Sequence, residues 1–140
     1  MKTVISTLIL TLVFGSFNFV SAQTKQQIKV LINRQKVISG SKLTIKFASL
    51  VEDSRCPTDT NCIDAGNARI TIKVSKSNGA AQTFELNTNS APQFVTFAGY
   101  RIKLTDLNPR PATNIRINRN GYTATFVVTN TETIEVGVLL

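Results

Sequence analysis

The residues best suited to chemistry are concentrated in one short stretch, residues 51–66, which reads VEDSRCPTDTNCIDAG. This stretch contains both cysteines of the chain and four of its eight acidic residues, in a protein whose net charge is +8. The acidic residues are Glu52, Asp53, Asp59 and Asp64. Carboxylates and cysteines at this density are typical of three kinds of site: a catalytic acid pair, a metal site or a disulfide-closed loop.

The chain contains few residues suited to acid–base or nucleophilic catalysis. It contains no histidine, which excludes Ser–His and Cys–His nucleophilic sites and histidine-based zinc or copper sites. It also has no glycine-rich phosphate-binding loop of either standard kind. A pair of the four carboxylates could in principle carry out hydrolysis, but a surface loop offers little that would raise the pKa of one of them. We therefore expect a protein that is not an enzyme and needs no cofactor.

A calcium site is a second possibility for the same stretch, because Ca²⁺ prefers several oxygen ligands. The candidate ligands are Asp53, Asp59, Asn61 and Asp64. Their spacing does not match an EF-hand, in which the third ligand would fall on Ile63. Asp and Asn residues in loops more often cap their own turns. A calcium-binding loop is thus an alternative to a loop with a structural role.

The first 22 residues have the layout of a Sec signal peptide. A basic start, Met1-Lys2-Thr3, is followed by an apolar run over residues 4–20 and by the small-residue end Val20-Ser21-Ala22. Polar residues interrupt the run, which argues against an uncleaved anchor, and Gln23 at the expected cleavage point argues against a lipoprotein. We expect a mature domain of residues 23–140 that is periplasmic or secreted and has no membrane span after cleavage.

Cys56 and Cys62 are expected to form a disulfide, because an even number of cysteines in an oxidising compartment normally pairs. Their spacing is wider than that of a CxxC redox site. So small a ring would contribute about 2 kcal/mol and would mainly fix the local shape of the loop. Arg55 is expected to pair with Asp53 or Glu52 at the surface, which would orient the loop while adding little stability.

Apolar and polar residues alternate with period two through most of the chain, which indicates β-strands. Strands are therefore expected on both sides of the cysteine-containing loop. The alternation is found at residues 28–32, 43–47, 68–75, 84–86, 100–104, 115–117 and 122–128, and residues 134–140 are apolar enough for a last strand. The pattern predicts an all-β fold, a single antiparallel β-sandwich (Ig-like) of about seven to eight strands, with a small β-barrel as the alternative. A disulfide-clasped loop over residues 51–67 would join two of the core strands.

Turn residues separate these alternating runs. Asn78-Gly79 and Asn120-Gly121 predict type I′ hairpin turns, since both residue types tolerate a positive φ. The stretch Asn108-Pro109-Arg110-Pro111 predicts a loop or a sheet edge, because proline lacks the N–H group that a strand ladder requires.

Basic residues on the strands predict a second candidate surface. Six of them fall opposite the apolar positions: Lys46, Arg69, Lys73, Arg101, Lys103 and Arg116. If their strands are neighbours, these residues form a cationic face that could bind an anionic glycan, with an affinity that falls as salt rises. Nucleic acid is not expected there, because single-strand binding needs interleaved aromatic rings and the Phe and Tyr residues lie on the apolar side.

Several short motifs resemble a group of small secreted bacterial proteins that carry a DSRCP…C.WAG signature followed by an LxPxP element. This chain reads DSRCP at residues 53–57, then Asn61-Cys62, Ala65-Gly66 and, at residues 107–111, LNPRP. The resemblance covers nearly the whole mature chain and implies a secreted, β-rich domain with a disulfide-clasped loop; it supplies no function. Asp64 stands where the signature has tryptophan, so a packing or stacking role of that ring does not carry over.

These observations favour a non-catalytic binding or interaction module of a bacterial cell envelope, with an anionic glycan or another envelope protein as its partner. The loop end around residues 51–67 is the first candidate surface and the cationic face is the second. The candidate ligand residues of the loop are Glu52, Asp53, Arg55, Asp59, Asn61 and Asp64. A structural accessory domain of the envelope and a calcium-binding loop protein are the alternatives, and an enzyme ranks below both.

Overall fold

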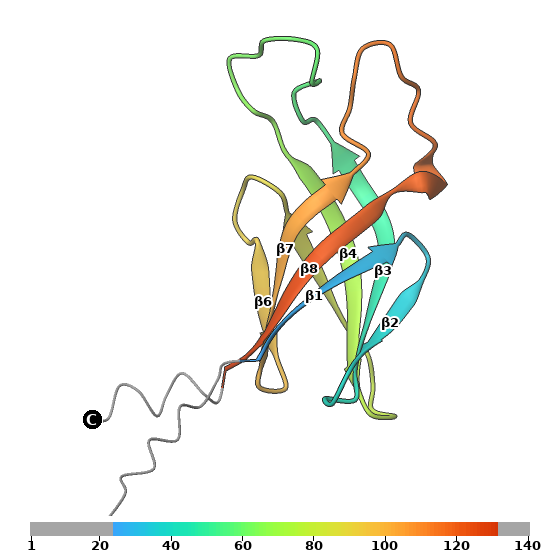
Figure 1. Cartoon of the computed structure of the whole chain (residues 1–140), viewed down its shortest axis with the longest axis vertical. Coiled ribbons are helices and arrows are strands. Elements are labelled where there is room, and N and C mark those ends of the chain that lie inside the picture. The colour runs from blue at the N-terminus through green and yellow to red at the C-terminus, as the bar shows by residue number, and fades with distance from the viewer. Residues whose placement is uncertain (1–23, 132–140) are drawn as a thin grey trace, which may run out of the picture.

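The computed structural model describes residues 24–131, which form two layers of β-strands (Figure 1). The strands are β1 (Lys25–Leu31), β2 (Gln35–Ile38), β3 (Leu43–Asp53), β4 (Ala68–Lys76), β5 (Gln82–Asn87), β6 (Phe94–Phe97), β7 (Tyr100–Asn108) and β8 (Thr123–Asn130), and a 3₁₀ helix spans Arg119–Gly121. No helix among the described residues is long and apolar enough to cross a membrane. The predicted signal peptide and the predicted strand at residues 134–140 lie outside the described residues.

The strands form two four-stranded sheets, and every pair of neighbours is antiparallel. Sheet A has the order β1-β8-β7-β6 and sheet B has the order β2-β3-β4-β5. The predicted antiparallel sandwich is confirmed, and its eight strands fall within the predicted number. The barrel alternative is wrong, because each sheet ends in edge strands and does not close on itself.

The core lies between the sheets and is filled by alternate residues of the long strands. Ile45 and Phe47 of β3 and Ile72 of β4 are 0% exposed and belong to one buried cluster with Phe126 of β8. Burial of each such side chain contributes about 1.5–3 kcal/mol. The period-two pattern that predicts these strands is therefore also what holds the two sheets together.

Two edge strands and one loop differ from the sequence prediction. The alternation does not predict β2 and β6, because each is only four residues long and most of its side chains are exposed or half-buried. The predicted strand at residues 115–117 is wrong: these residues lie in the loop between β7 and the 3₁₀ helix, and Ile115 is 58% exposed. β7 pairs directly with β8, so these residues form the connection between the two strands and enter neither sheet.

The turns also differ from the prediction. Asn78-Gly79 does lie between β4 and β5, but the positive φ falls on Ser77, so the type I′ assignment is wrong. Asn120-Gly121 is part of the 3₁₀ helix and not of a hairpin. Positive φ at both central residues occurs at Ala98 (49°) and Gly99 (79°), which join β6 to β7.

Candidate functional site

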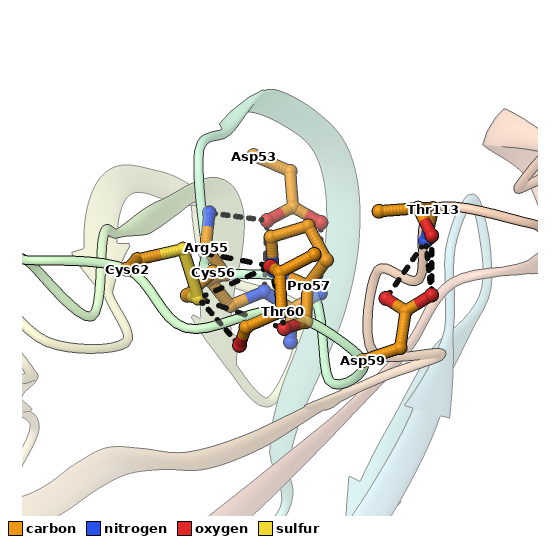
Figure 2. The surroundings of a disulfide bond; sticks show 8 residues. All are labelled: Asp53, Arg55, Cys56, Pro57, Asp59, Thr60, Cys62 and Thr113. Carbon is orange, nitrogen blue, oxygen red and sulfur yellow. Dashed lines mark hydrogen bonds and ion pairs between the residues drawn. A yellow bond between two sulfur atoms is a disulfide. The ribbon is translucent and has the colours of Figure 1, made fainter.

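Two long loops lie together at one end of the sandwich, drawn in green and orange at the top of Figure 1. The disulfide loop, residues 54–67, joins β3 to β4, and the proline loop, residues 109–118, follows β7. The predicted Cys56–Cys62 disulfide is present, with 5.9 Å between the Cα atoms (Figure 2). β3 continues to Asp53, so the first three residues of the predicted loop belong to a strand.

The stem of the disulfide loop is a narrow backbone ladder. The Ser54 N–H donates to the Asn67 carbonyl and the Cys56 N–H to the Ala65 carbonyl, each at 2.8 Å. Gly66 lies in this stem with a φ of +70°, and a Cβ atom there would be 1.9 Å from the Ser54 carbonyl oxygen. The stem therefore requires glycine at this position, both for its φ and for the close backbone approach.

At the base of the loop, Asp53 and Arg55 form a bidentate ion pair. Arg55 Nε donates to Asp53 Oδ1 and Nη2 donates to Oδ2, both at 2.8 Å (Figure 2). The predicted pairing is confirmed, but its predicted surface location is wrong. The two side chains are only 9% and 8% exposed, because the proline loop and Tyr122 cover them.

The same pair connects three segments that are distant in sequence. Arg55 Nη1 donates to the Leu107 carbonyl at 2.6 Å and Nη2 donates to the Pro109 carbonyl at 2.9 Å. The Tyr122 hydroxyl donates to Asp53 Oδ2 at 3.0 Å. The pair thus joins the end of β3 in sheet B to the ends of β7 and β8 in sheet A.

The pKa values of this cluster follow from its burial and its partners. Burial alone would raise the pKa of Asp53, but the hydrogen bonds and charge of Arg55, with the Tyr122 hydroxyl, hold that pKa below its ordinary value. Burial, and then the hydrogen bond to the Asp53 carboxylate, raise the pKa of Tyr122. Asp53 is therefore a stable anion and Tyr122 a stable hydrogen-bond donor, which suits a structural role.

A second set of contacts fastens the tip of the disulfide loop to the proline loop. The Thr58 N–H donates to the Pro111 carbonyl at 2.9 Å. The Asp59 carboxylate accepts hydrogen bonds from the Thr113 N–H, at 3.0 Å, and from the Thr113 hydroxyl (Figure 2). These hydrogen bonds lower the pKa of Asp59. The carbonyls of residues 107, 109 and 111 thus all accept hydrogen bonds from the disulfide loop.

The calcium interpretation does not agree with this geometry. Asp53 is occupied by Arg55 and Tyr122, and Asp59 is occupied by Thr113, on different sides of the loop. Residues 24–131 contain no group of three or more acidic, histidine or cysteine side chains that could hold a metal ion. Asp53 and Asp59 thus have different partners, and Asn61 and Asp64 are exposed, so the four proposed ligands do not form one site.

The remaining polar candidates make none of the hydrogen bonds described above for the two loops. Asn61 and Asp64 are exposed, and Glu52 lies 3.8 Å from Arg69 on the outer side of sheet B. Between Asn61 and Asp64, Ile63 is fully exposed, at 105%. The tip of the disulfide loop therefore presents an aliphatic side chain next to a carboxylate and an amide.

A polar hollow of about 270 Å³ lies below the disulfide loop. It is lined by Arg55, Cys56, Ala65, Thr88, Asn89, Thr105, Asp106, Leu107 and Arg110. Its one carboxylate, Asp106, is 3.7 Å from Arg110, and none of the four carboxylates of the disulfide stretch lines it. Two carboxylates facing each other across a substrate, as in glycoside hydrolysis, are thus not found in this hollow.

The six basic residues predicted to share one face lie on three different surfaces. Lys46 and Lys73 are direct cross-strand partners on the outer side of sheet B, where Arg69 also lies. Arg101 and Lys103 lie on the outer side of sheet A, and Arg116 lies in the proline loop. The prediction of a single face is wrong because β3 and β4 belong to one sheet and β7 to the other.

One aromatic residue is also placed differently from the prediction. Phe94 of β6 does not lie on the apolar side: it is 41% exposed and pairs with Lys103 in the sheet A register. The Arg101 guanidinium lies over its ring, 3.7 Å from the centroid. As an edge strand, β6 leaves this ring uncovered.

Several residues that build the loop end are not among the predicted site residues. They are Gly66, Leu107, Pro109, Pro111, Thr113 and Tyr122. The prolines offered a partial signal, because a segment without N–H groups presents only carbonyls to its neighbours. The DSRCP and LNPRP motifs contact each other directly, since Arg55 of the first binds backbone carbonyls of the second. Comparison with protein-family models, curated proteins and solved structures finds no match for this chain.

Proposed function

We propose that the protein is a non-catalytic binding module that works outside the cytoplasm, in the periplasm or after secretion. Its contact surface would be the loop end, formed by the disulfide loop and the proline loop. Its partner would be another protein of the cell envelope. Loops held at one end of a rigid sandwich commonly carry binding function.

The observation that carries this proposal is the combination of rigid loops with apolar tips. The disulfide, the buried ion pair and the contacts of Thr58 and Asp59 restrain the loops before any partner binds. A preorganised surface loses less conformational entropy on association. On these restrained loops, Ile63 is 105% exposed and Ile115 is 58% exposed.

The charges around these tips indicate what the partner surface should offer. Arg110 and Arg116 of the proline loop are exposed, and Asp64 is the exposed acid beside Ile63. A partner with apolar pockets for the two isoleucines and a mostly acidic rim would be complementary. The disulfide supports an oxidising compartment, where such a bond persists.

Site-specific photocrosslinking tests the proposal in cells of the organism that encodes the protein. A photoreactive amino acid at position 63 or 115 should give a discrete adduct with one envelope protein. The control is position 37, because Val37 is 65% exposed but lies on β2, away from the loop end. A structural accessory role would be favoured instead if positions 63 and 115 gave no adduct, or only the adducts that position 37 gives.

A further inference from the structure

The outer face of sheet A carries cations in two rows with a low strip between them. Lys25 and Lys29 lie on β1, and Arg101 and Lys103 lie on β7; all four are exposed. β8 runs between these strands and pairs with both. Because neighbouring strands are about 4.8 Å apart, the two rows are separated by about 10 Å.

The floor between the rows is made of short side chains. The outward residues of β8 are Thr123, Thr125, Val127 and Thr129. Thr129 pairs with Lys25 on one side and with Arg101 on the other, which places a hydroxyl between two cations. Lysine and arginine side chains are longer than those of threonine and valine, so the cations border β8 on both sides; Thr125, which is 3% exposed, is covered by its neighbours. We call this surface, with its four cations, the sheet A trough.

The charge of the trough is not neutralised within the described part of the chain. Among residues 24–131, Lys25, Lys29 and Lys103 have no ion-pair partner, and Arg101 stacks on the ring of Phe94. The nearest acid on this side, Asp106, lies 3.7 Å from Arg110. Asp106 pairs with Thr125 on the side opposite Lys29, so one carboxylate lies at this end of the strip, against the four cations. A strip with this excess of positive charge attracts polyanions.

The outer face of sheet B differs, although it also carries lysines. Lys46 and Lys73 lie side by side there, but Arg69 is 3.8 Å from each of the carboxylates of Glu52 and Glu85. This face therefore mixes both signs of charge. It provides a matched control surface on the same molecule.

We propose that the sheet A trough binds a linear anionic polysaccharide laid along β8. Carboxylate or sulfate groups of the polymer would meet the cations on both sides. The partly exposed hydroxyls of Thr123 and Thr129 would hydrogen-bond sugar hydroxyls. This proposal goes beyond the protein-binding role of the loop end and uses a different surface.

The chemistry of the trough favours a polysaccharide over other polyanions. Binding of single-stranded nucleic acid usually relies on several aromatic rings on which bases stack. Here Phe94 is the one aromatic residue on this face among the described residues, and Arg101 already covers its ring. No large aliphatic side chain protrudes from β8 to insert into a lipid surface, because its outward apolar residue is only Val127.

The test measures binding of the mature chain to polygalacturonate by fluorescence anisotropy at several salt concentrations. We expect binding that weakens steeply with salt, and none to uncharged dextran. The double variant K29S/K103S should lose at least tenfold in affinity and show a shallower salt dependence. The matched double variant K46S/K73S, which removes the same charge from sheet B, should lose less than threefold. I63S should leave the affinity unchanged, which separates this site from the loop end.

The proposal is overturned if the two double variants lose affinity equally, since attraction would then come from net charge alone. It is also overturned if polygalacturonate does not bind at low salt. Tighter binding of a single-stranded oligonucleotide, or of anionic phospholipid vesicles, than of the polysaccharide would likewise refute it. Thermal melting of both double variants should match the unmodified protein, because all four lysines are at the surface and in no ion pair among residues 24–131.

Discussion

Replacement of Arg55 by alanine should be among the most destabilising single changes in this protein. The substitution removes four side-chain hydrogen bonds, two to Asp53 and one each to the carbonyls of Leu107 and Pro109. The Asp53 carboxylate, which is 8% exposed in the unmodified protein, keeps the Tyr122 hydroxyl as its remaining side-chain partner. Removal of one member of a buried ion pair costs about 3–5 kcal/mol, and we expect a loss in this range.

The matched control is the exposed pair of Arg110 and Asp106. Its charged atoms are 3.7 Å apart and its side chains are 67% and 38% exposed. Water already solvates both groups, so R110A should change the free energy of unfolding by less than about 0.5 kcal/mol. The two arginine variants thus remove the same charge from the same end of the molecule and differ in burial.

Urea unfolding of residues 23–140, followed by far-UV circular dichroism, measures both variants. A loss of less than about 1 kcal/mol for R55A, or a loss no larger than that of R110A, would contradict this prediction, because the buried pair would then behave as a surface pair. If R55A unfolds with the same m value as the unmodified protein, the substitution has not changed the compactness of the folded and unfolded states.

A pH series provides a second check on the same variant. Asp53 has a pKa below its ordinary value of 3.8 in the folded protein, so its contribution to stability is present above that value and lost as pH falls through the folded pKa. Without Arg55, burial dominates and should raise the pKa of Asp53 above its ordinary value. The difference in the free energy of unfolding between the unmodified protein and R55A should therefore begin to shrink above pH 3.8 and continue to shrink as the pH falls through the lowered pKa of Asp53 in the unmodified protein.

Three further predictions concern the loop end. G66A should lower the free energy of unfolding by about 3 kcal/mol in urea, because its Cβ would lie 1.9 Å from the Ser54 carbonyl oxygen. Gly40 has a similar φ of +77° but open space around the Cβ position, so G40A should lower it by about 1 kcal/mol. Reduction of the disulfide should lower the free energy of unfolding by about 2 kcal/mol, and a loss above 4 kcal/mol would mean that the ring does more than restrict the unfolded chain. Y122F should cost about 1–2 kcal/mol at pH 7 and less as the pH falls through the lowered pKa of Asp53; a cost that does not change with pH would argue against the hydrogen bond between them.

The sandwich was predictable because burial imposes an alternating pattern on long strands. Ile70, Ile72 and Val74 are all 0% exposed, and they stand at every second position of β4. β2 and β6 could not be predicted in this way, since edge strands with exposed side chains do not need alternation. Residues 115–117 alternate without being a strand, because alternation does not specify whether a neighbouring strand is present to pair with.

The site was predictable only where its partners are close in sequence. The pairing of Asp53 with Arg55 follows from opposite charges two residues apart. Its burial does not, because it depends on Leu107 and Pro109, which reach Arg55 through backbone carbonyls that every residue type possesses. Tyr122 is 69 residues away from Asp53 in the sequence, and only the fold brings the two side chains together.

The order of the strands sets the order in which the two sheets can assemble. Sheet B is made of four consecutive strands, so each pairing closes a short stretch of chain. Sheet A requires β1 to find β8, with Lys25 opposite Thr129, and this closure across most of the domain is the slower one to form. A chain that crosses a membrane with its N-terminus first would therefore carry β1 unpaired until β8 emerges. Sheet B could form earlier in such a crossing, whereas sheet A would be completed only after β8 has emerged.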